Sequence, residues 1–135
     1  ADMRQAIIPQ GLAAAAAASG FSPAIRSRDF LFLTGATGGC ADGTMPQSAQ
    51  EQARNALKKV AEILTAAGAT EKDVVELTSY HTDIGTSFPE VQTELHAFFS
   101  PPLPARTAVE MAGLRRPGAQ VEFRIIARDS FQATP

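Results

Sequence analysis

Two segments of the chain repeat apolar residues at intervals of three and four, the spacing that places them on one face of a helix. This spacing predicts helices over Ser48–Ala67 and Ser87–Phe99. Each begins with a serine followed three residues later by a glutamate (Glu51 or Glu90), so that the two side chains satisfy free backbone N–H groups of the first turn. Gly68 is expected to end the first helix, and a run of prolines the second.

Other segments are rich in β-branched and aromatic residues or alternate apolar with polar side chains, as strands do. Strands are expected at Met3–Ile8, Ala24–Ser27, Phe30–Thr34, Val74–Thr82, Ala105–Ala112 and Ala119–Asp129. The glycine-rich segment Gly35–Pro46 is expected to be a loop. Because each helix has one apolar stripe, the two helices most simply cover one face of a single sheet, an α+β architecture. The other face is left for a partner subunit.

The composition fits one folded domain over residues 1–135, with 44% hydrophobic and 19% charged residues. A net charge of -2 disfavours a nucleic-acid partner. No apolar run approaches the roughly 18–20 residues of a membrane span, so no membrane partner is expected. Cys40 is the only cysteine, which excludes an intramolecular disulfide and a Cys-clustered metal site. His81 and His96, the only histidines, leave little for a His-based metal site.

The alanine run Ala13–Ala18 has two interpretations, a signal peptide or an alanine-rich loop or short helix. The segment lacks the Leu, Ile and Val density of a signal sequence, and the charges before it are mixed, with Asp2 and Arg4. We therefore expect the loop or short helix. A lone thiol without an export signal favours a cytoplasmic location.

Several motifs that often carry chemistry are weak here. Gly35–Gly39 follows a strand but matches neither nucleotide-binding glycine pattern, and the next helix begins too far along the chain to complete a phosphate cradle. His81 and Asp83 are not accompanied by a serine-nucleophile elbow, so His81 is interpreted as a structural histidine. Cys40 has no basic neighbour within three residues that would lower its pKa.

One constellation stands out, with Arg106 at the start of a strand that three prolines stiffen, and Glu122 sixteen residues later. Alternation along the last two strands is expected to point both side chains to the same face of the sheet, with Val109 on the opposite face. A guanidinium held this way binds a carboxylate through two parallel hydrogen bonds, and a nearby carboxylate can orient water or move a proton. An ordinary Arg–Glu pair across adjacent strands explains the spacing equally well.

The chain resembles the RidA/YjgF family of enamine and imine deaminases, formerly labelled endoribonuclease L-PSP. The similarity runs over nearly the whole length and includes Gly20–Ile25, Phe32–Gly35, Glu51–Leu57, Leu64–Gly68, Asp73–Val75, Tyr80–Asp83, Phe88–Phe99, Pro102–Thr107 and Val121–Glu122. The resemblance implies a fold like that of bacillus-type chorismate mutase, a mixed sheet with two helices on one face. It also implies a homotrimer that closes its sheets into a barrel, with sites between subunits.

The activity that the resemblance implies is hydrolysis of 2-imino acids to 2-ketoacids and ammonia, without a cofactor or metal. Arg106 would hold the carboxylate of this small substrate, and Glu122 would position water and assist proton transfer. Thr107, Thr34 and Gly35 would line the pocket.

The chain also departs from the family pattern. Phe21 stands where a tyrosine is usual, Thr34 where serine is commoner, and Gln92 where the deaminases carry asparagine. The loop at Gly35–Pro46 differs as well. These changes place the chain in a divergent subgroup, and Phe21 predicts a more apolar pocket.

Two other functions stay open. The first is a non-catalytic trimer that binds a small carboxylate metabolite or a partner protein in the same cleft. The second is an endoribonuclease or translation inhibitor, which a local basic patch of Arg115, Arg116, Arg124 and Arg128 would have to support against the net negative charge.

Overall fold

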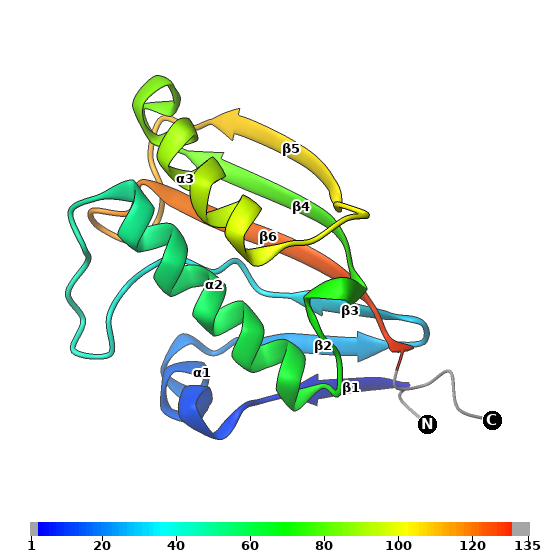
Figure 1. Ribbon diagram of the computed structural model, residues 1–135. Coiled ribbons are helices and arrows are strands. Elements are labelled where there is room, and N and C mark those ends of the chain that lie inside the picture. The colour runs from blue at the N-terminus through cyan, green and yellow to red at the C-terminus, as the bar shows by residue number, and fades with distance from the viewer. Residues whose placement is uncertain (1–2, 131–135) are drawn as a thin grey trace.

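A single six-stranded sheet with helices packed on one of its faces forms the protein, as a computed structural model of residues 3–130 shows (Figure 1). The strands are β1 (Arg4–Ile7), β2 (Ala24–Ser27), β3 (Phe30–Leu33), β4 (Val74–His81), β5 (Ala105–Glu110) and β6 (Val121–Arg128). The helices are α1 (Ala13–Ser19), α2 (Ala49–Ala66) and α3 (Ile84–Phe98), with short 3-10 turns at Gln10–Leu12 and Glu71–Asp73. The mixed sheet and the helix layer confirm the predicted α+β class.

The strands lie in the order β1-β2-β3-β6-β4-β5, and all pairs are antiparallel except β4 with β5. The expectation that β5 and β6 are neighbours was wrong. Strands that follow each other in the chain often pair, but β4, α3 and β5 form a crossover unit that places β5 parallel to β4 at the sheet edge. β6 then fills the space between β3 and β4.

The core lies between the sheet and the helices α2 and α3, which cover the same face (Figure 1). The sheet contributes Leu31, Leu77 and Phe123, all at most 1% exposed. Burying a large apolar side chain this fully stabilises the fold by roughly 1.5–3 kcal/mol. Alanines on the buried face of α2, among them Ala53 and Ala56, leave room for the helix to approach the strands closely.

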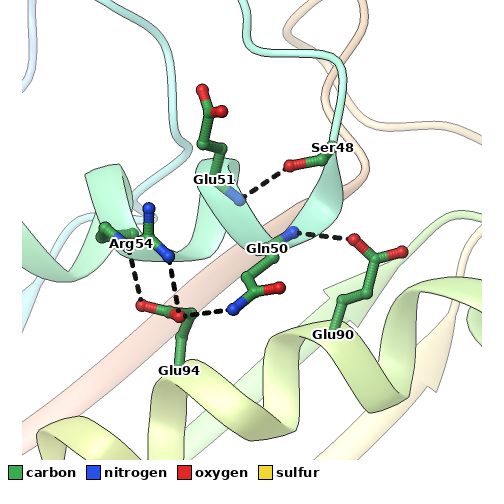
Figure 2. A network of polar contacts seen from close by, with 6 residues as sticks. All are labelled: Ser48, Gln50, Glu51, Arg54, Glu90 and Glu94. Carbon is green, nitrogen blue, oxygen red and sulfur yellow. Dashed lines mark hydrogen bonds and ion pairs between the residues drawn. The ribbon is translucent and has the colours of Figure 1, made fainter.

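The start of α2 agrees with the sequence, since the hydroxyl of Ser48 accepts a hydrogen bond from the backbone N–H of Glu51 at 3.0 Å (Figure 2). The predicted start of α3 was wrong. This helix begins at Ile84, whose N–H donates to the Glu110 carboxylate of β5 at 2.9 Å. Ser87 therefore lies within the first turn. Its hydroxyl forms a hydrogen bond with His81 of β4 instead of capping the helix.

The alanine run forms α1, as the short-helix interpretation predicted, and the helix ends at Gly20 in the left-handed conformation (φ 77°). α1 lies beside the outer strands β1 and β2 (Figure 1). None of the helices within residues 3–130 combines the length and the apolar character that a membrane span requires.

The face of the sheet opposite α2 and α3, here called the open face, carries exposed apolar side chains. Phe30 and Phe32 of β3 are 42% and 41% exposed, and their rings lie 6.4 Å apart. A single subunit leaves these aromatic rings in water, which is unfavourable for large apolar groups. The expected partner subunit on this face stays a prediction.

Candidate functional site

Arg106 extends from the edge strand β5 toward α3. Its Cα is level with that of Leu77 in β4, so both side chains point to the helix-covered face. Its Nε and Nη2 donate to the hydroxyl of Ser79 at 3.2 and 2.9 Å, and its Nη1 donates to the Gln92 side-chain oxygen at 2.6 Å. The guanidinium carbon lies 5.1 Å from the centre of the Phe88 ring. We call Arg106, Ser79, Phe88 and Gln92 the arginine cluster.

The charge of Arg106 has no opposite charge beside it. All of its partners are neutral, and the ion pairs found among residues 3–130 do not include it. Burial lowers the pKa of Arg106, because desolvation penalises its charged form. Beside the guanidinium is a cavity of about 90 Å³, which Leu103, Pro104 and Phe99 help to line. An anionic ligand in this cavity would therefore meet a positive charge that no protein group balances.

A chain of hydrogen bonds through Ser79, His81 and Ser87 fixes the position of the arginine cluster. Ser79 accepts from Arg106, so its own hydroxyl proton is available to His81 Nε2 at 2.8 Å. Ser87 donates to the Thr82 carbonyl at 3.1 Å, so its oxygen accepts from His81 Nδ1 at 3.0 Å. These directions require a neutral His81 with its proton on Nδ1. Burial, together with the charge of Arg106, lowers the pKa of His81 and agrees with this state. The structural interpretation of His81 is confirmed.

Glu122 lies on the open face, so the expectation that it shares a face with Arg106 was wrong. It is level with Tyr80, whereas Arg106 is level with Leu77, and β4 separates their strands. The prediction was wrong because the edge strand β5 has an arginine, and not an apolar residue, on the helix-covered face opposite Leu77. The apolar Val109 of this strand faces the open side with Tyr80. A direct pair between Arg106 and Glu122 within one chain is thereby excluded.

The remaining predicted site residues divide between the two faces. Gln92 belongs to the arginine cluster, whereas Thr107 lies beside Thr78 and faces the open side. Gly35 packs under the Glu122 carboxylate, and a Cβ atom at this position would collide with it. The hydroxyl of Thr34 donates to the Ser22 carbonyl at 2.7 Å, which fastens this segment to the chain next to Phe21.

Glu122, Thr34 and Gly35 line an open-face cavity of about 400 Å³ together with Tyr80 and Arg124. Phe21 is 75% exposed and lines an adjoining cavity that also has Thr34 and Gly35 in its wall. We call Phe21, Thr34, Gly35 and Glu122 the glutamate cluster. The structure thus brings the predicted residues together as two separate groups, except Thr107, which belongs to neither.

Sequence reasoning missed Ser79, Phe88 and Tyr80. A signal for Ser79 existed, because it alternates with Leu77 and His81 on a strand face that is otherwise buried. A polar side chain on such a face requires a partner. Phe88 and Tyr80 have no comparable signal, since aromatic residues on helices and strands most often serve the core.

The four arginines of the proposed basic patch have different surroundings. Arg116 packs against Gly39, and Arg128 is bonded to Asp73 at 3.1 Å. Arg124 lines the open-face cavity, and Arg115 is exposed on the loop before β6.

The protein is a small α+β protein, as its sheet order and helix layer show. Comparisons with known proteins identify its family. Residues 11–129 match the family described as endoribonuclease L-PSP. The chain belongs to this family, the RidA/YjgF family that its motifs indicated.

The relatives extend over most of the chain. It is 39% identical over 126 residues to the RutC family protein YjgH of Escherichia coli K12, covering 93% of this chain and 95% of that protein. The solved structure of protein YJGH has a TM-score of 0.86 at 38% identity, covering 94% of this chain and 97% of that one. A mouse protein named 2-iminobutanoate/2-iminopropanoate deaminase is 34% identical over 116 residues, 84% of each chain.

Proposed function

We propose that the protein hydrolyses 2-imino acids, or their enamine tautomers, to 2-ketoacids and ammonia. The observation that carries this proposal is the half-buried Arg106, whose neutral partners orient its guanidinium without neutralising it. A substrate carboxylate supplies the missing charge through a bidentate contact. The relatives named as 2-iminobutanoate/2-iminopropanoate deaminases support this choice of substrate.

The complete site is formed between subunits of a homotrimer in this proposal. Arg106 and Glu122 are on opposite faces of the sheet with β4 between their strands, so one chain does not present both to the same small molecule. Two neighbouring copies supply them if the arginine cluster of one subunit meets the glutamate cluster of the next. The exposed Phe30 and Phe32 support a packed open face, since a neighbouring sheet would remove them from water.

The chemistry follows from the two charges. Arg106 fixes the carboxylate plane and so places the adjacent C=N carbon for attack. Glu122 accepts a proton from water as the water oxygen bonds to that carbon, and it passes this proton to the imine nitrogen as the C=N bond becomes single. The hydroxyl proton of the resulting carbinolamine then moves to the nitrogen, the C–N bond breaks to release ammonia, and the C=O bond forms. No electrons are exchanged with a cofactor in this hydrolysis.

Mixed assemblies test both the reaction and the shared site. Arg106→Ala and Glu122→Gln chains are each purified and assayed, and then co-expressed with different affinity tags so that mixed oligomers can be isolated. Ketoacid formation is followed while a pyridoxal-phosphate enzyme supplies 2-aminoacrylate. Each variant alone is expected to be inactive, and the isolated mixed trimers should regain about one third of the sites if each site takes one cluster from each neighbour.

The control is a mixture of Arg106→Ala with Arg106→Lys chains, which contains no complete arginine cluster and should show no more activity than Arg106→Lys chains alone. Failure of the first mixture to regain activity would contradict a site shared between copies. Absence of turnover by the wild type, with ketoacid binding retained, would favour the non-catalytic carboxylate binder instead.

A further inference from the structure

A second cavity adjoins the glutamate cluster and contains two positive charges. It has a volume of about 300 Å³ and lies between α1, α2 and the segment after β3. Its wall includes Phe21, Thr34, Gly35, Ile63, Lys59 and Arg116. No aspartate or glutamate is among the described residues that line it. The cavity is therefore apolar along its sides and cationic at Lys59 and Arg116.

Lys59 projects from α2 and is partly buried. Its Nζ donates to the Thr37 carbonyl at 2.7 Å, which uses one of its three N–H groups. Burial and the nearby charge of Arg116 both lower the pKa of Lys59. Within residues 3–130, neither cation has a carboxylate at ion-pair distance. An anion in this cavity would relieve the repulsion between them.

Glycines that the nucleotide-binding interpretation did not explain leave room for Arg116 and for the start of α2. The Arg116 guanidinium packs against Gly39, where an added Cβ would lie 2.7 Å from Nη2. Gly38 packs more closely still against the backbone of Gln52, where an added Cβ would collide with the carbonyl oxygen, so both glycines provide space. The Arg116 guanidinium itself has only a long contact, 3.5 Å, to the Gly43 carbonyl.

Gln52 fixes the two loops that meet here. It is fully buried, its amide nitrogen donates to the carbonyls of Pro46 and Gly118 at 2.6 and 3.1 Å, and its oxygen accepts from the Gln120 N–H at 2.7 Å. The loop after β3 and the loop before β6 are thereby fastened beside the start of α2 (Figure 1). Arg116 is positioned by this frame rather than by a charged neighbour.

We propose that this cavity binds the distal carboxylate of the substrate, so that the protein prefers 2-imino acids with an acidic side chain over apolar ones. Thr34 and Gly35 lie in the walls of both this cavity and the Glu122 cavity, so the two cavities are neighbours at that segment. A substrate whose reacting carbon is at Glu122 extends past Phe21 toward Lys59 and Arg116. This inference rests on the proposed deaminase function and specifies its substrate class.

The test compares two ketoacid products of equal chain length by isothermal titration calorimetry. 2-Oxoadipate carries a distal carboxylate, and 2-oxohexanoate ends in a methyl group. The wild type is expected to bind 2-oxoadipate about tenfold to a hundredfold more tightly, the range for charge-assisted hydrogen bonds. Lys59→Gln and Arg116→Gln should each lose at least about tenfold of affinity for 2-oxoadipate, and the double variant should bind the two ketoacids about equally.

Matched controls are Lys58→Gln and Arg115→Gln, the adjacent exposed residues with the same charges, which should keep the preference. Equal binding of both ketoacids by the wild type, or a preference that persists in the double variant, would overturn the inference. Turnover of 2-aminoacrylate, which has no distal group, is measured on the same wild-type preparation. If the wild type turns over 2-aminoacrylate but binds both ketoacids equally, the deaminase proposal stays intact and only the preference for acidic substrates is overturned. If it neither turns over 2-aminoacrylate nor binds a ketoacid, both proposals are overturned.

Discussion

Two arginines on the helix-covered face of the same sheet have opposite surroundings. Arg26 of β2 is 6% exposed, and its Nε donates to the buried Asp129 carboxylate at 2.7 Å. A second of its nitrogens donates to the Ala67 carbonyl at the end of α2, where the helix dipole favours a positive charge. Arg106 of β5 is oriented just as firmly, but only by Ser79, Gln92 and the Phe88 ring.

One of these arginines has a charge that serves the fold, and the other has a charge that is available to a ligand. The Arg26 charge is balanced inside the fold, and the pair ties the end of the sheet to the end of α2. The Arg106 charge is oriented by dipoles that do not cancel it, so binding an anion costs no internal ion pair. We therefore propose that Arg106 serves ligand binding, and we expect Arg26 to serve stability.

The largest expected effect is on stability at Arg26. Arg26→Ala leaves the Asp129 carboxylate buried without its cation, which typically costs about 3–5 kcal/mol. The free energy of unfolding, measured by urea titration with circular dichroism, should fall by that amount. A double variant, Arg26→Met with Asp129→Leu, should recover most of the loss because no isolated charge remains. Equal stability of wild type and Arg26→Ala would remove the contrast between the two arginines.

The next effect is on activity at Arg106. Arg106→Lys keeps the charge but loses the planar fork, so imine hydrolysis should fall roughly tenfold to a hundredfold while weak ketoacid binding remains. Its unfolding free energy should change far less than that of Arg26→Ala, because no carboxylate depends on it. The measurement is kcat/KM on protein of wild-type oligomeric state. A large loss of stability with undiminished activity would make Arg106 structural.

Local signals predicted most of the fold. The 3-and-4 spacing located α2 and α3 and their common layer, and Ser48 gave the start of α2 correctly. The start of α3 escaped prediction because its first N–H is satisfied by Glu110 from a different strand, a contact that no local pattern encodes. The position of β6 between β3 and β4 depends on long-range pairing in the same way.

The site was predicted as residues but not as an arrangement. The motifs selected Arg106, Glu122, Thr34 and Gly35, and the structure groups the last three. Alternation on an edge strand did not give the direction of Arg106, since polar and apolar side chains occur on both faces there. Lys59 and Arg116 are 57 residues apart in the chain, and only the loops held by Gln52 bring them to one cavity.

A moderate effect is expected from pH through His81. Its pKa is lowered in the folded protein from an ordinary value of 6.5, so the unfolded chain binds the extra proton first. Stability is therefore greatest above pH 6.5 and declines as the pH falls below it, by at most about 1.4 kcal/mol per pH unit. His81→Gln should flatten this dependence between pH 6.5 and 5, whereas the exposed His96→Gln should not. An unchanged slope in His81→Gln would contradict the neutral, bonded state that supports Arg106.

The smallest effect is expected at a third arginine, which is exposed and paired. Arg54 of α2 donates to both oxygens of Glu94 of α3 at 3.1 and 3.2 Å, and Gln50 donates to the same carboxylate at 3.0 Å (Figure 2). Arg54 is 49% exposed, so water and salt screen the pair and holding both side chains costs entropy. Arg54→Ala should lower the melting temperature only slightly, with the difference shrinking as salt is added. The Arg54 and Gln50 contacts lower the pKa of Glu94, so this contribution exists above pH 4.5 and disappears as acid protonates the carboxylate. A loss of stability as large as that of Arg26→Ala would contradict this expectation. It would mean that the contribution of an arginine to stability depends here on bridging α2 and α3 and not on burial.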